Sequence, residues 1–116
     1  MTGKIQIVKL DDVEATPEDD GLLMERNILN ESHGSKRFDF VHANCLDGLD
    51  LKDVEYDGQD ELVYVVQGEC EIKFDGQAHR VGAGGTIFVP ANTLYDFKTT
   101  KTPLEVIAVF SPGGGH

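Results

Sequence analysis

The chain has 116 residues, of which 40% are hydrophobic and 27% are charged, a balance that is typical of a globular domain and not of a disordered segment. Twenty-one acidic residues against ten basic ones give a formal charge of −11, and such a field repels phosphate backbones and anionic lipid surfaces. We therefore expect a single domain over residues 1–116 that binds neither nucleic acid nor membranes.

Cysteine content and the N-terminal sequence indicate the compartment. Cys45 and Cys70 are the only cysteines, too few and too widely spaced for a disulfide framework or a zinc knuckle. The first residues contain no apolar run of the length that a signal peptide needs, and no stretch is apolar enough to span a bilayer. These features predict a soluble protein in the reduced cytoplasm.

Residues 1–35 predict a peripheral region before the main body of the domain. A first strand is expected over Ile5–Leu10, followed by an acidic surface loop over Asp11–Gly21. Leu22–Leu29 is apolar enough for a strand or a short helix, and eight residues do not separate the two by periodicity. A strand is favoured because the sequence downstream has β character, and a turn is expected over Asn30–Lys36.

From Phe38 onward the residues alternate with a period of two, as in a strand with two different faces. One face carries Phe38, Phe40, His42 and Asn44, and the other carries Asp39, Val41, Ala43 and Cys45. The aromatic residues beside His42 predict that the first face points inward. Phe40 and His42 are therefore candidates for an internal binding site.

The remainder of the chain predicts short strands separated by turns. Gln67–Gly68 and Asp75–Gly76 fit two-residue hairpins, because glycine adopts the positive φ that such turns need. Strands are expected over Leu49–Tyr56, Leu62–Val66, Cys70–Phe74, Ala78–Val81, Thr86–Val89, Tyr95–Lys98 and Leu104–Phe110. Roughly nine or ten strands with no convincing helix predict an antiparallel sandwich or barrel. Residues 112–116 are expected to form a flexible tail.

Two spacings within this pattern resemble a known family. The chain reads Glu61-x6-Gly68 and then Gly84-x5-Pro90-x-Asn92. This is similar to the cupin superfamily motifs, G-x5-H-x-H-x3-4-E-x6-G and G-x5-P-x-G-x2-H-x3-N. The resemblance covers about residues 36–110 and implies an all-β fold, a cupin-type antiparallel jelly-roll β-barrel. Many single-domain cupins are dimers, so it also implies a homodimer, with the predicted N-terminal strand covering a neighbour's sheet.

The chain departs from the family at the metal-binding positions. Glu55 and Asp57 stand where cupins have the two histidines of the first motif, and Tyr95 stands where they have the later histidine. Only Glu61 matches a usual ligand, so the resemblance does not carry over an iron, manganese, zinc or nickel site. The run Tyr56–Gly68 also looks similar to histidine-poor cupins of the ethanolamine-utilisation and ureidoglycine-type branches.

If the barrel forms, alternation puts Glu61 on the inner face, and acidic and phenolic groups gather around it. The residues expected to converge there are Glu55, Asp57, Tyr95 and His42. Burial and like charges raise carboxyl pKa values, so Glu61 is the candidate general acid or base. Tyr95 would stabilise an enolate-like oxygen, and His42 would be a further catalytic partner.

The expected substrate is a small polar carbonyl or carboxylate compound. Glu55, Asp57 and Phe40 are the candidate binding residues around it, and the guanidinium of Arg26 could pair with a substrate carboxylate. Isomerisation, epimerisation, β-elimination and cyclisation all fit this proton-transfer chemistry.

Two other interpretations remain open from the sequence. Glu61 could be a buried carboxylate satisfied by hydrogen bonds, in a barrel that binds or senses a small molecule without chemistry. Alternatively, Glu55, Asp57, Glu61 and Tyr95 could hold Mg²⁺, Mn²⁺ or Ca²⁺, because carboxylate and phenolate oxygens are hard donors. The leading expectation is an enzyme without a cofactor.

Overall fold

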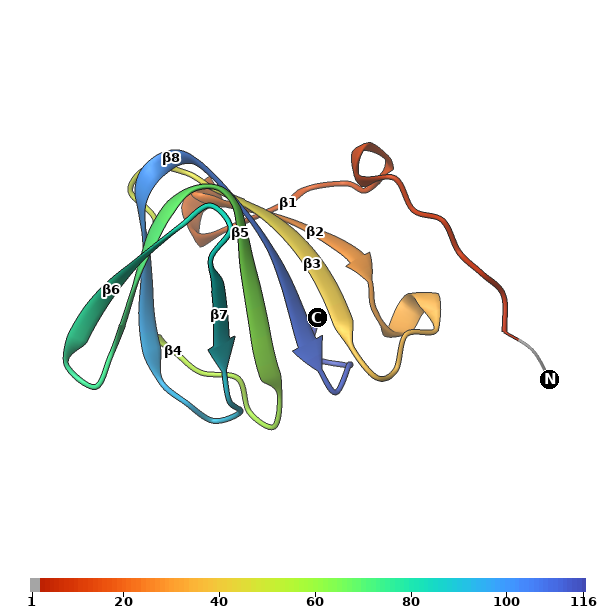
Figure 1. The fold of residues 1–116 in the computed structure, drawn as a ribbon. Coiled ribbons are helices and arrows are strands. Elements are labelled where there is room, and N and C mark those ends of the chain that lie inside the picture. The colour runs from red at the N-terminus through yellow and green to blue at the C-terminus, as the bar shows by residue number, and fades with distance from the viewer. Residues whose placement is uncertain (1–2) are drawn as a thin grey trace.

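In the computed structural model, which describes residues 3–116, eight antiparallel strands curl into a barrel (Figure 1). The strands are β1 (Thr16–Glu18), β2 (Leu23–Leu29), β3 (Asp39–Cys45), β4 (Asp50–Val54), β5 (Asp60–Phe74), β6 (Gln77–Gly82), β7 (Thr86–Val89) and β8 (Tyr95–Ser111). Three 3-10 turns, η1 (Leu10–Asp12), η2 (Asp19–Gly21) and η3 (Glu31–His33), complete the described elements. None of the helices within residues 3–116 has the length and apolar character needed to cross a bilayer.

The two long strands, β5 and β8, pair with each other and belong to both walls of the barrel. Strand order is β1-β2-β3-β8-β5-β6, with β4 added to β8 and β7 added to β5. The second half of β8 pairs with β3, and the first half of β5 pairs with β7, which makes one wall. The first half of β8 pairs with β4 and the second half of β5 with β6, which makes the other. The predicted all-β antiparallel jelly-roll barrel is confirmed.

The bend that carries β5 from one wall to the other lies at Gly68, where the sequence predicts a hairpin. That prediction is wrong, because β5 continues through this point with irregular register against β8 between Val65 and Glu69. Gly68 has a φ of 83°, and a Cβ there would lie 2.6 Å from the carbonyl oxygen of Lys101. Glycine is needed for the close approach of two bent strands. The hairpin at Asp75–Gly76 is confirmed, and it joins β5 to β6.

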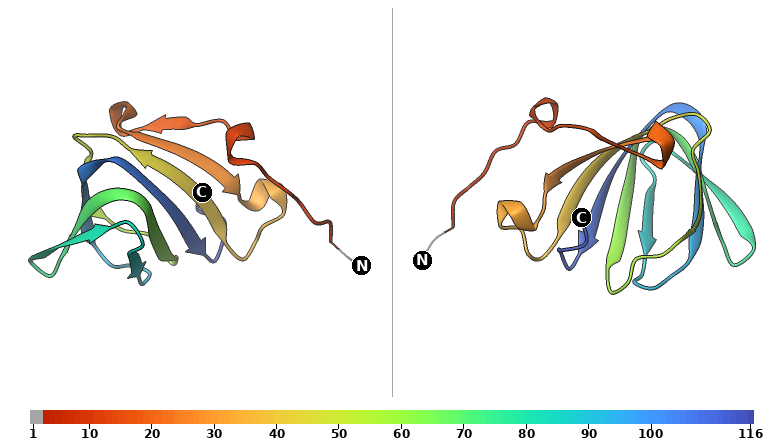
Figure 2. Two further views of the ribbon diagram at one scale, coloured as in Figure 1. Left: turned by 45° about the horizontal axis from the view of Figure 1, so that its top comes forward. Right: turned by 180° about the vertical axis from the view of Figure 1, so that it is seen from behind.

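The N-terminal segment differs most from its prediction. Residues 5–10 form no strand, and the segment leaves the barrel as an extended arm (Figures 1 and 2). Ile5 and Ile7 are 95% and 90% exposed. A strand needs a neighbour for its backbone groups, and this arm pairs with none of the described strands. Its contact with the body is a side-chain hydrogen bond from Nε2 of Gln6 to the carbonyl oxygen of His33 over 2.7 Å. The strand predicted over Leu22–Leu29 is present as β2.

The inner faces of the strands form rows that cross the barrel wall. The row nearest one end contains Asp39 of β3, Phe110 of β8, Glu61 of β5 and Val89 of β7, paired side by side. All four side chains are buried. The adjacent rows contain Val, Ala and Ile side chains, so two carboxylates lie in one row beside an apolar core.

Candidate functional site

The barrel contains a cavity of about 70 Å³ that is partly open to solvent and has mostly apolar walls. Valine, leucine, isoleucine and phenylalanine side chains form most of the lining, and four residues contribute polar oxygens: Glu25, Tyr56, Glu61 and Tyr95. A volume of this size holds a few water molecules or a very small ligand, since drug-sized pockets are roughly 300 Å³ or more. We call this cavity the lumen.

Glu61 and Tyr95 form the central polar pair of the lumen. The Tyr95 hydroxyl donates a hydrogen bond to Oε1 of Glu61 over 2.6 Å, and both side chains are buried. Glu61 comes from β5 and Tyr95 from the start of β8, so the barrel brings together two residues far apart in sequence. The structure places Glu61, Val63 and Val65 inward, as alternation from Glu61 predicts. It also places Tyr95 beside Glu61, as predicted.

The Glu61 carboxyl titrates close to neutral pH. Burial raises its pKa from an ordinary 4.5 to about 7, and the negative charge of Glu25 adds to the rise, while the hydrogen bond from Tyr95 opposes it. A carboxyl with this pKa is partly protonated at pH 7. It can therefore give or take a proton under physiological conditions, which is the property of a general acid or base.

Tyr56 and Glu25 complete the polar set. Tyr56 lies in the loop before β5, and Glu25 lies on β2, opposite the inward-facing Ala43 of β3. Burial raises the pKa of the Tyr56 and Tyr95 hydroxyls, and the negative charge of Glu61 raises both pKa values further. Burial also raises the pKa of Glu25. At neutral pH the two tyrosines are therefore protonated hydrogen-bond donors.

The sequence places His42 and Phe40 on the inner face of their strand, and this is wrong. Val41, Ala43 and Cys45 line the lumen instead, which turns the even-numbered residues to the outer face. His42 is buried on that outer side, with Nε2 2.7 Å from Oε2 of Glu105. The register of β3 against β8 sets this direction, since Val41 and Ala43 pair with Ala108 and Val106, which also line the lumen. His42 therefore has no contact with Glu61, and Phe40 does not line the lumen.

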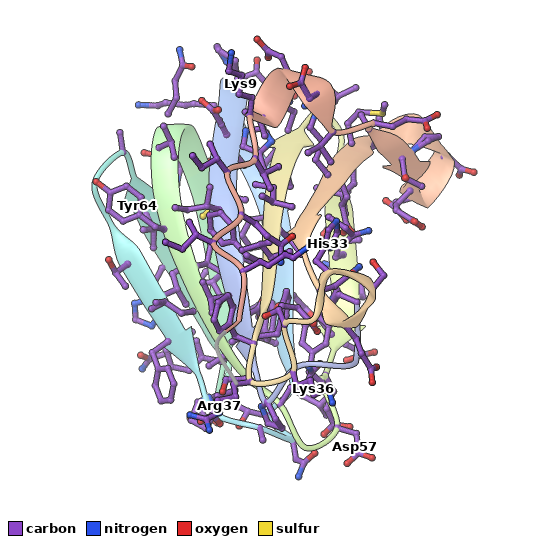
Figure 3. The ribbon with its side chains drawn as sticks, turned by 90° about the vertical axis from the view of Figure 1, so that its right-hand side faces the viewer. Lys9, His33, Lys36, Arg37, Asp57 and Tyr64 are labelled. Carbon is purple, nitrogen blue, oxygen red and sulfur yellow. The ribbon has the colours of Figure 1, made fainter. Side chains whose placement is uncertain are left out.

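Glu55, Asp57 and Arg26 also lie away from the lumen. Glu55 and Asp57 are exposed in the loop after β4, and Asp57 projects from the lower edge of the molecule (Figure 3). The residue between them, Tyr56, takes the inward position. Arg26 lies on β2 beside Glu25, but its Nε donates to the carbonyl oxygen of Val13. The expected convergence of Glu55 and Asp57 on Glu61 is wrong, and Arg26 does not line the lumen where it was expected to meet a substrate carboxylate.

The lumen does not fit the metal sites considered from sequence. The oxygen-donor set of Glu55, Asp57, Glu61 and Tyr95 is not assembled, since two of its members face solvent. Within residues 3–116 no group of three or more histidine, cysteine, aspartate or glutamate side chains has the geometry of a metal site. No imidazole lines the lumen. The Glu61 carboxyl already accepts a hydrogen bond from Tyr95, and we assign the lumen no metal.

The two cysteines do not supply a nucleophile. Both are buried and unpaired, Cys45 in the wall of the lumen and Cys70 in the core beside Ile72. Burial raises the pKa of Cys45 to about 12 and that of Cys70 to about 11. A thiol is reactive as its thiolate, so both groups are unreactive at neutral pH.

Sequence reasoning missed Tyr56, Glu25 and a second buried carboxylate, Asp39. Alternation through the loop before β5 would have placed Tyr56 opposite to Glu55 and Asp57. The available signal for Glu25 was its position two residues after Leu23, on the same face of β2, and both side chains line the lumen. Asp39 belongs to the same inward row as Glu61, but its partners lie at the other end of the chain.

Comparison with known proteins agrees with this architecture. A family model described as a cupin domain matches residues 53–110. KdgF from a Halomonas species superposes with a TM-score of 0.83 at 18% identity, covering 94% of this chain and 96% of that one. Ectoine synthase from P. lautus gives 0.80 at 18% identity, covering 95% and 80%. The polyketide cyclase RemF from Streptomyces resistomycificus gives 0.79 at 20% identity, covering 94% and 80%.

At these identities the structural likeness establishes the fold and no activity. No curated protein matches the sequence. The matched family model covers half of the chain. It includes β5, which carries Glu61, and most of β8, which carries Tyr95. On this match, together with the barrel and its strand order, the chain belongs to the cupin family.

Proposed function

We propose that this cupin is an enzyme that transfers protons on a small polar carbonyl or carboxylate compound, with Glu61 as the acid and base. The observation that carries the proposal is the buried Glu61 carboxyl, 2.6 Å from the Tyr95 hydroxyl and with a pKa of about 7. Proton transfer is most efficient when the pKa of the catalytic group lies near the working pH.

The chemistry follows from the positions of Glu61, Tyr56 and Tyr95 in the lumen. The Glu61 carboxylate takes a proton from the carbon next to the substrate carbonyl. The electrons of that C–H bond form a C=C bond, and the negative charge moves to the carbonyl oxygen. A protonated phenol, Tyr56, donates a hydrogen bond to that oxygen, while Tyr95 holds Glu61 in place.

The enolate then has several outcomes. Glu61, now a carboxylic acid, can return the proton to a neighbouring carbon, which gives isomerisation. Return of the proton to the opposite face of the same carbon, after the enolate has turned over in the lumen, gives epimerisation. Loss of a leaving group from the next carbon gives β-elimination, and attack of the enolate carbon on a second carbonyl gives a ring. Two of the similar structures are named as a polyketide cyclase and an ectoine synthase, which supports small-molecule chemistry in this fold.

The experiment measures proton exchange directly, so it does not require the natural substrate. Small carbonyl compounds, including pyruvate, dihydroxyacetone and acetoacetate, are incubated with the protein in D₂O. Loss of the α-proton signal is followed by ¹H NMR. We expect at least one compound to exchange faster than in buffer, and Glu61→Gln to slow this exchange by about 10²-fold or more.

A matched control removes an acid elsewhere. Glu14→Gln changes the same charge at an exposed position far from the lumen, and it should leave exchange unchanged. Equal rates for wild type and Glu61→Gln would refute Glu61 as the base.

The second candidate function is binding without chemistry. The observation in its favour is that the lumen walls are largely apolar and that the Glu61 carboxyl already has a hydrogen-bond donor. Chemical-shift changes of lumen residues on addition of a compound, with no exchange of its α-protons, would support this function. They would count against the enzyme.

We further propose that two copies of the chain associate. Apolar side chains on the outer side of the barrel remain exposed, namely Leu62, Tyr64 and Val66 of β5 and Phe88 of β7, and Tyr64 is seen projecting from that side in Figure 3. The N-terminal arm, residues 3–9, carries the exposed Ile5 and Ile7 and two lysines but no acid. Its charge complements the acidic body of a second copy, and apolar patches of this kind mark interfaces.

Sedimentation velocity tests this association. The wild-type chain should sediment as a dimer at micromolar concentration, and Ile5→Glu with Ile7→Glu should shift it towards monomer. A monomeric wild type at the highest soluble concentration would refute the proposal.

A further inference from the structure

Residues 112–116, which we call the closing segment, fold back onto the barrel. The sequence predicts a flexible tail here, but three successive backbone N–H groups donate to the carboxylate of Asp39. The distances are 3.1 Å from Gly114 to Oδ1 and 3.1 Å from both Gly115 and His116 to Oδ2. Asp39 is fully buried. Hydrogen bonds to an ionised carboxylate are about twice as strong as neutral ones, so this is a specific anchor.

A glutamine bridges the anchor and the segment. Nε2 of Gln59 donates to Oδ2 of Asp39 over 3.3 Å and to the carbonyl oxygen of Pro112 over 2.6 Å. The N–H of Gly113 donates to the carbonyl oxygen of Lys36 over 3.1 Å. The closing segment is therefore held at its start, middle and end by groups of the barrel body.

The last residue of the segment covers two rings of the lumen wall. The His116 ring stacks on Phe110, with centroids 3.8 Å apart and planes 21° apart, and lies 5.4 Å from the ring of Tyr56. Phe110 and Tyr56 both line the lumen. Phe110 stands between Asp39 and Glu61 in the inward row, so the closing segment covers the end of the lumen where Glu61 lies.

The absence of side chains lets the segment lie flat. A Cβ on Gly113 would come within 2.9 Å of the carbonyl oxygen of Lys36, and a Cβ on Gly115 within 2.8 Å of Cδ of Gln59. Real Cβ atoms do not approach so closely. The Gly113 contact is with the backbone, so a larger residue there would push the segment away from the barrel, whereas at Gly115 the side-chain amide of Gln59 would have to shift. The run of glycines is thus matched to the surface below it.

We propose that the closing segment is a lid that controls the access of small molecules to the lumen and limits their size. With the segment in place the lumen measures only about 70 Å³, below the range of ordinary ligand sites. The segment joins no sheet, and it is held by a few hydrogen bonds and one stacked ring, so it can open without unfolding the barrel. This inference rests on the proposed function only in that the lumen accepts a small molecule.

Tyrosine fluorescence gives a test that needs no substrate. The chain has three tyrosines and no tryptophan, and Tyr64 is the one outside the lumen. In a Tyr64→Phe background the remaining emission comes from Tyr56 and Tyr95. Acrylamide, a small neutral quencher, then reports how freely molecules reach the lumen.

Removal of the lid should increase quenching. A Tyr64→Phe chain ending at Ser111 is expected to show a quenching constant at least about threefold higher than its parent. Gly113→Val, in the chain of full length, should change quenching in the same direction because its side chain meets the backbone of Lys36 and displaces the segment. Gly3→Val is the control, since a Cβ there meets nothing within 4 Å, and it should leave quenching unchanged.

Near-UV circular dichroism and thermal unfolding establish that each variant is folded. Unchanged quenching in a folded chain ending at Ser111 would overturn the lid. Loss of folding in both the shortened chain and Gly113→Val would also overturn it, because the segment would then be part of the core. The proton-exchange assay fails or succeeds independently, since quenching is measured without substrate and requires no chemistry.

Discussion

Replacing Glu61 by glutamine should change how stability depends on pH. The carboxyl binds its proton more tightly in the folded chain, because burial raises its pKa from 4.5 to about 7. Glutamine has a similar shape and can still accept the hydrogen bond from Tyr95, but it has no charge to bury. The comparison therefore isolates the free energy of ionising one carboxyl inside the lumen.

The sign of the effect follows from proton linkage. Below pH 4.5 the carboxyl is protonated in both states, and the two proteins differ little. As the pH rises from 4.5 to about 7, the unfolded chain loses this proton before the folded one does, so the wild type loses stability. Above pH 7 the full effect is present, about 3 kcal/mol at ~1.4 kcal/mol for each pKa unit.

The measurement is urea unfolding of both proteins, followed by far-UV circular dichroism at intervals from pH 4.5 to pH 8. The quantity of interest is the unfolding free energy of Glu61→Gln minus that of wild type. Titrations of all other groups largely cancel in this difference, since both chains share them. We expect the difference to increase with pH and to level off above pH 7.

A difference that does not vary with pH would refute the reasoning, because Glu61 would then titrate as an ordinary exposed carboxyl. A difference that falls with rising pH would mean that the ionised form is the one stabilised by folding. In either case the carboxyl could not serve as the neutral-pH acid and base of the proposed mechanism. Direct titration of ¹³C-labelled glutamate by NMR gives an independent reading of the same pKa.

Three further predictions test the rest of the site and the fold. Tyr95→Phe removes the hydrogen-bond donor to Glu61, so NMR titration should show a still higher Glu61 pKa. Urea unfolding above pH 7 should show a loss of about 1–3 kcal/mol in stability. An unchanged Glu61 pKa would contradict the pairing. Gly68→Ala should cost more than about 2 kcal/mol in the same assay, because φ is 83° and the carbonyl oxygen of Lys101 is close; full stability would contradict the bend. His42→Leu should lower stability by about 1–3 kcal/mol, because it leaves the Glu105 carboxylate without its partner. The Glu61 titration should stay unchanged, and a shifted titration would place His42 in the lumen.

The sequence predicts the barrel well because its strands carry local signals. Alternating apolar residues around Val63 and Ile72 specify one buried face, and glycines mark the turns. The same alternation fixes Glu61 inward, since it is in phase with Val63 and Val65. Gly68 shows the limit of such signals, because a positive φ fits a hairpin turn and a bend between long strands equally well.

The sequence does not decide which face of β3 points inward. Both faces contain apolar residues, with Phe40 on one and Val41 on the other, so the period of two gives the alternation but not its direction. The pairing of β3 with β8 sets that direction, and it turns His42 outward towards Glu105. The loop before β5 is similar, since packing against Phe110 selects Tyr56 over the acids on either side of it.

By itself, then, the sequence determined the all-β barrel, the inward position of Glu61 and its neighbourhood with Tyr95, because these depend on local alternation and on motif spacing. Only the tertiary structure decided that Tyr56 and Glu25 complete the lumen and that Asp39 anchors the closing segment. Those partners lie on separate strands or at opposite ends of the chain. Contacts of that kind are set by strand register and burial, which no local pattern contains.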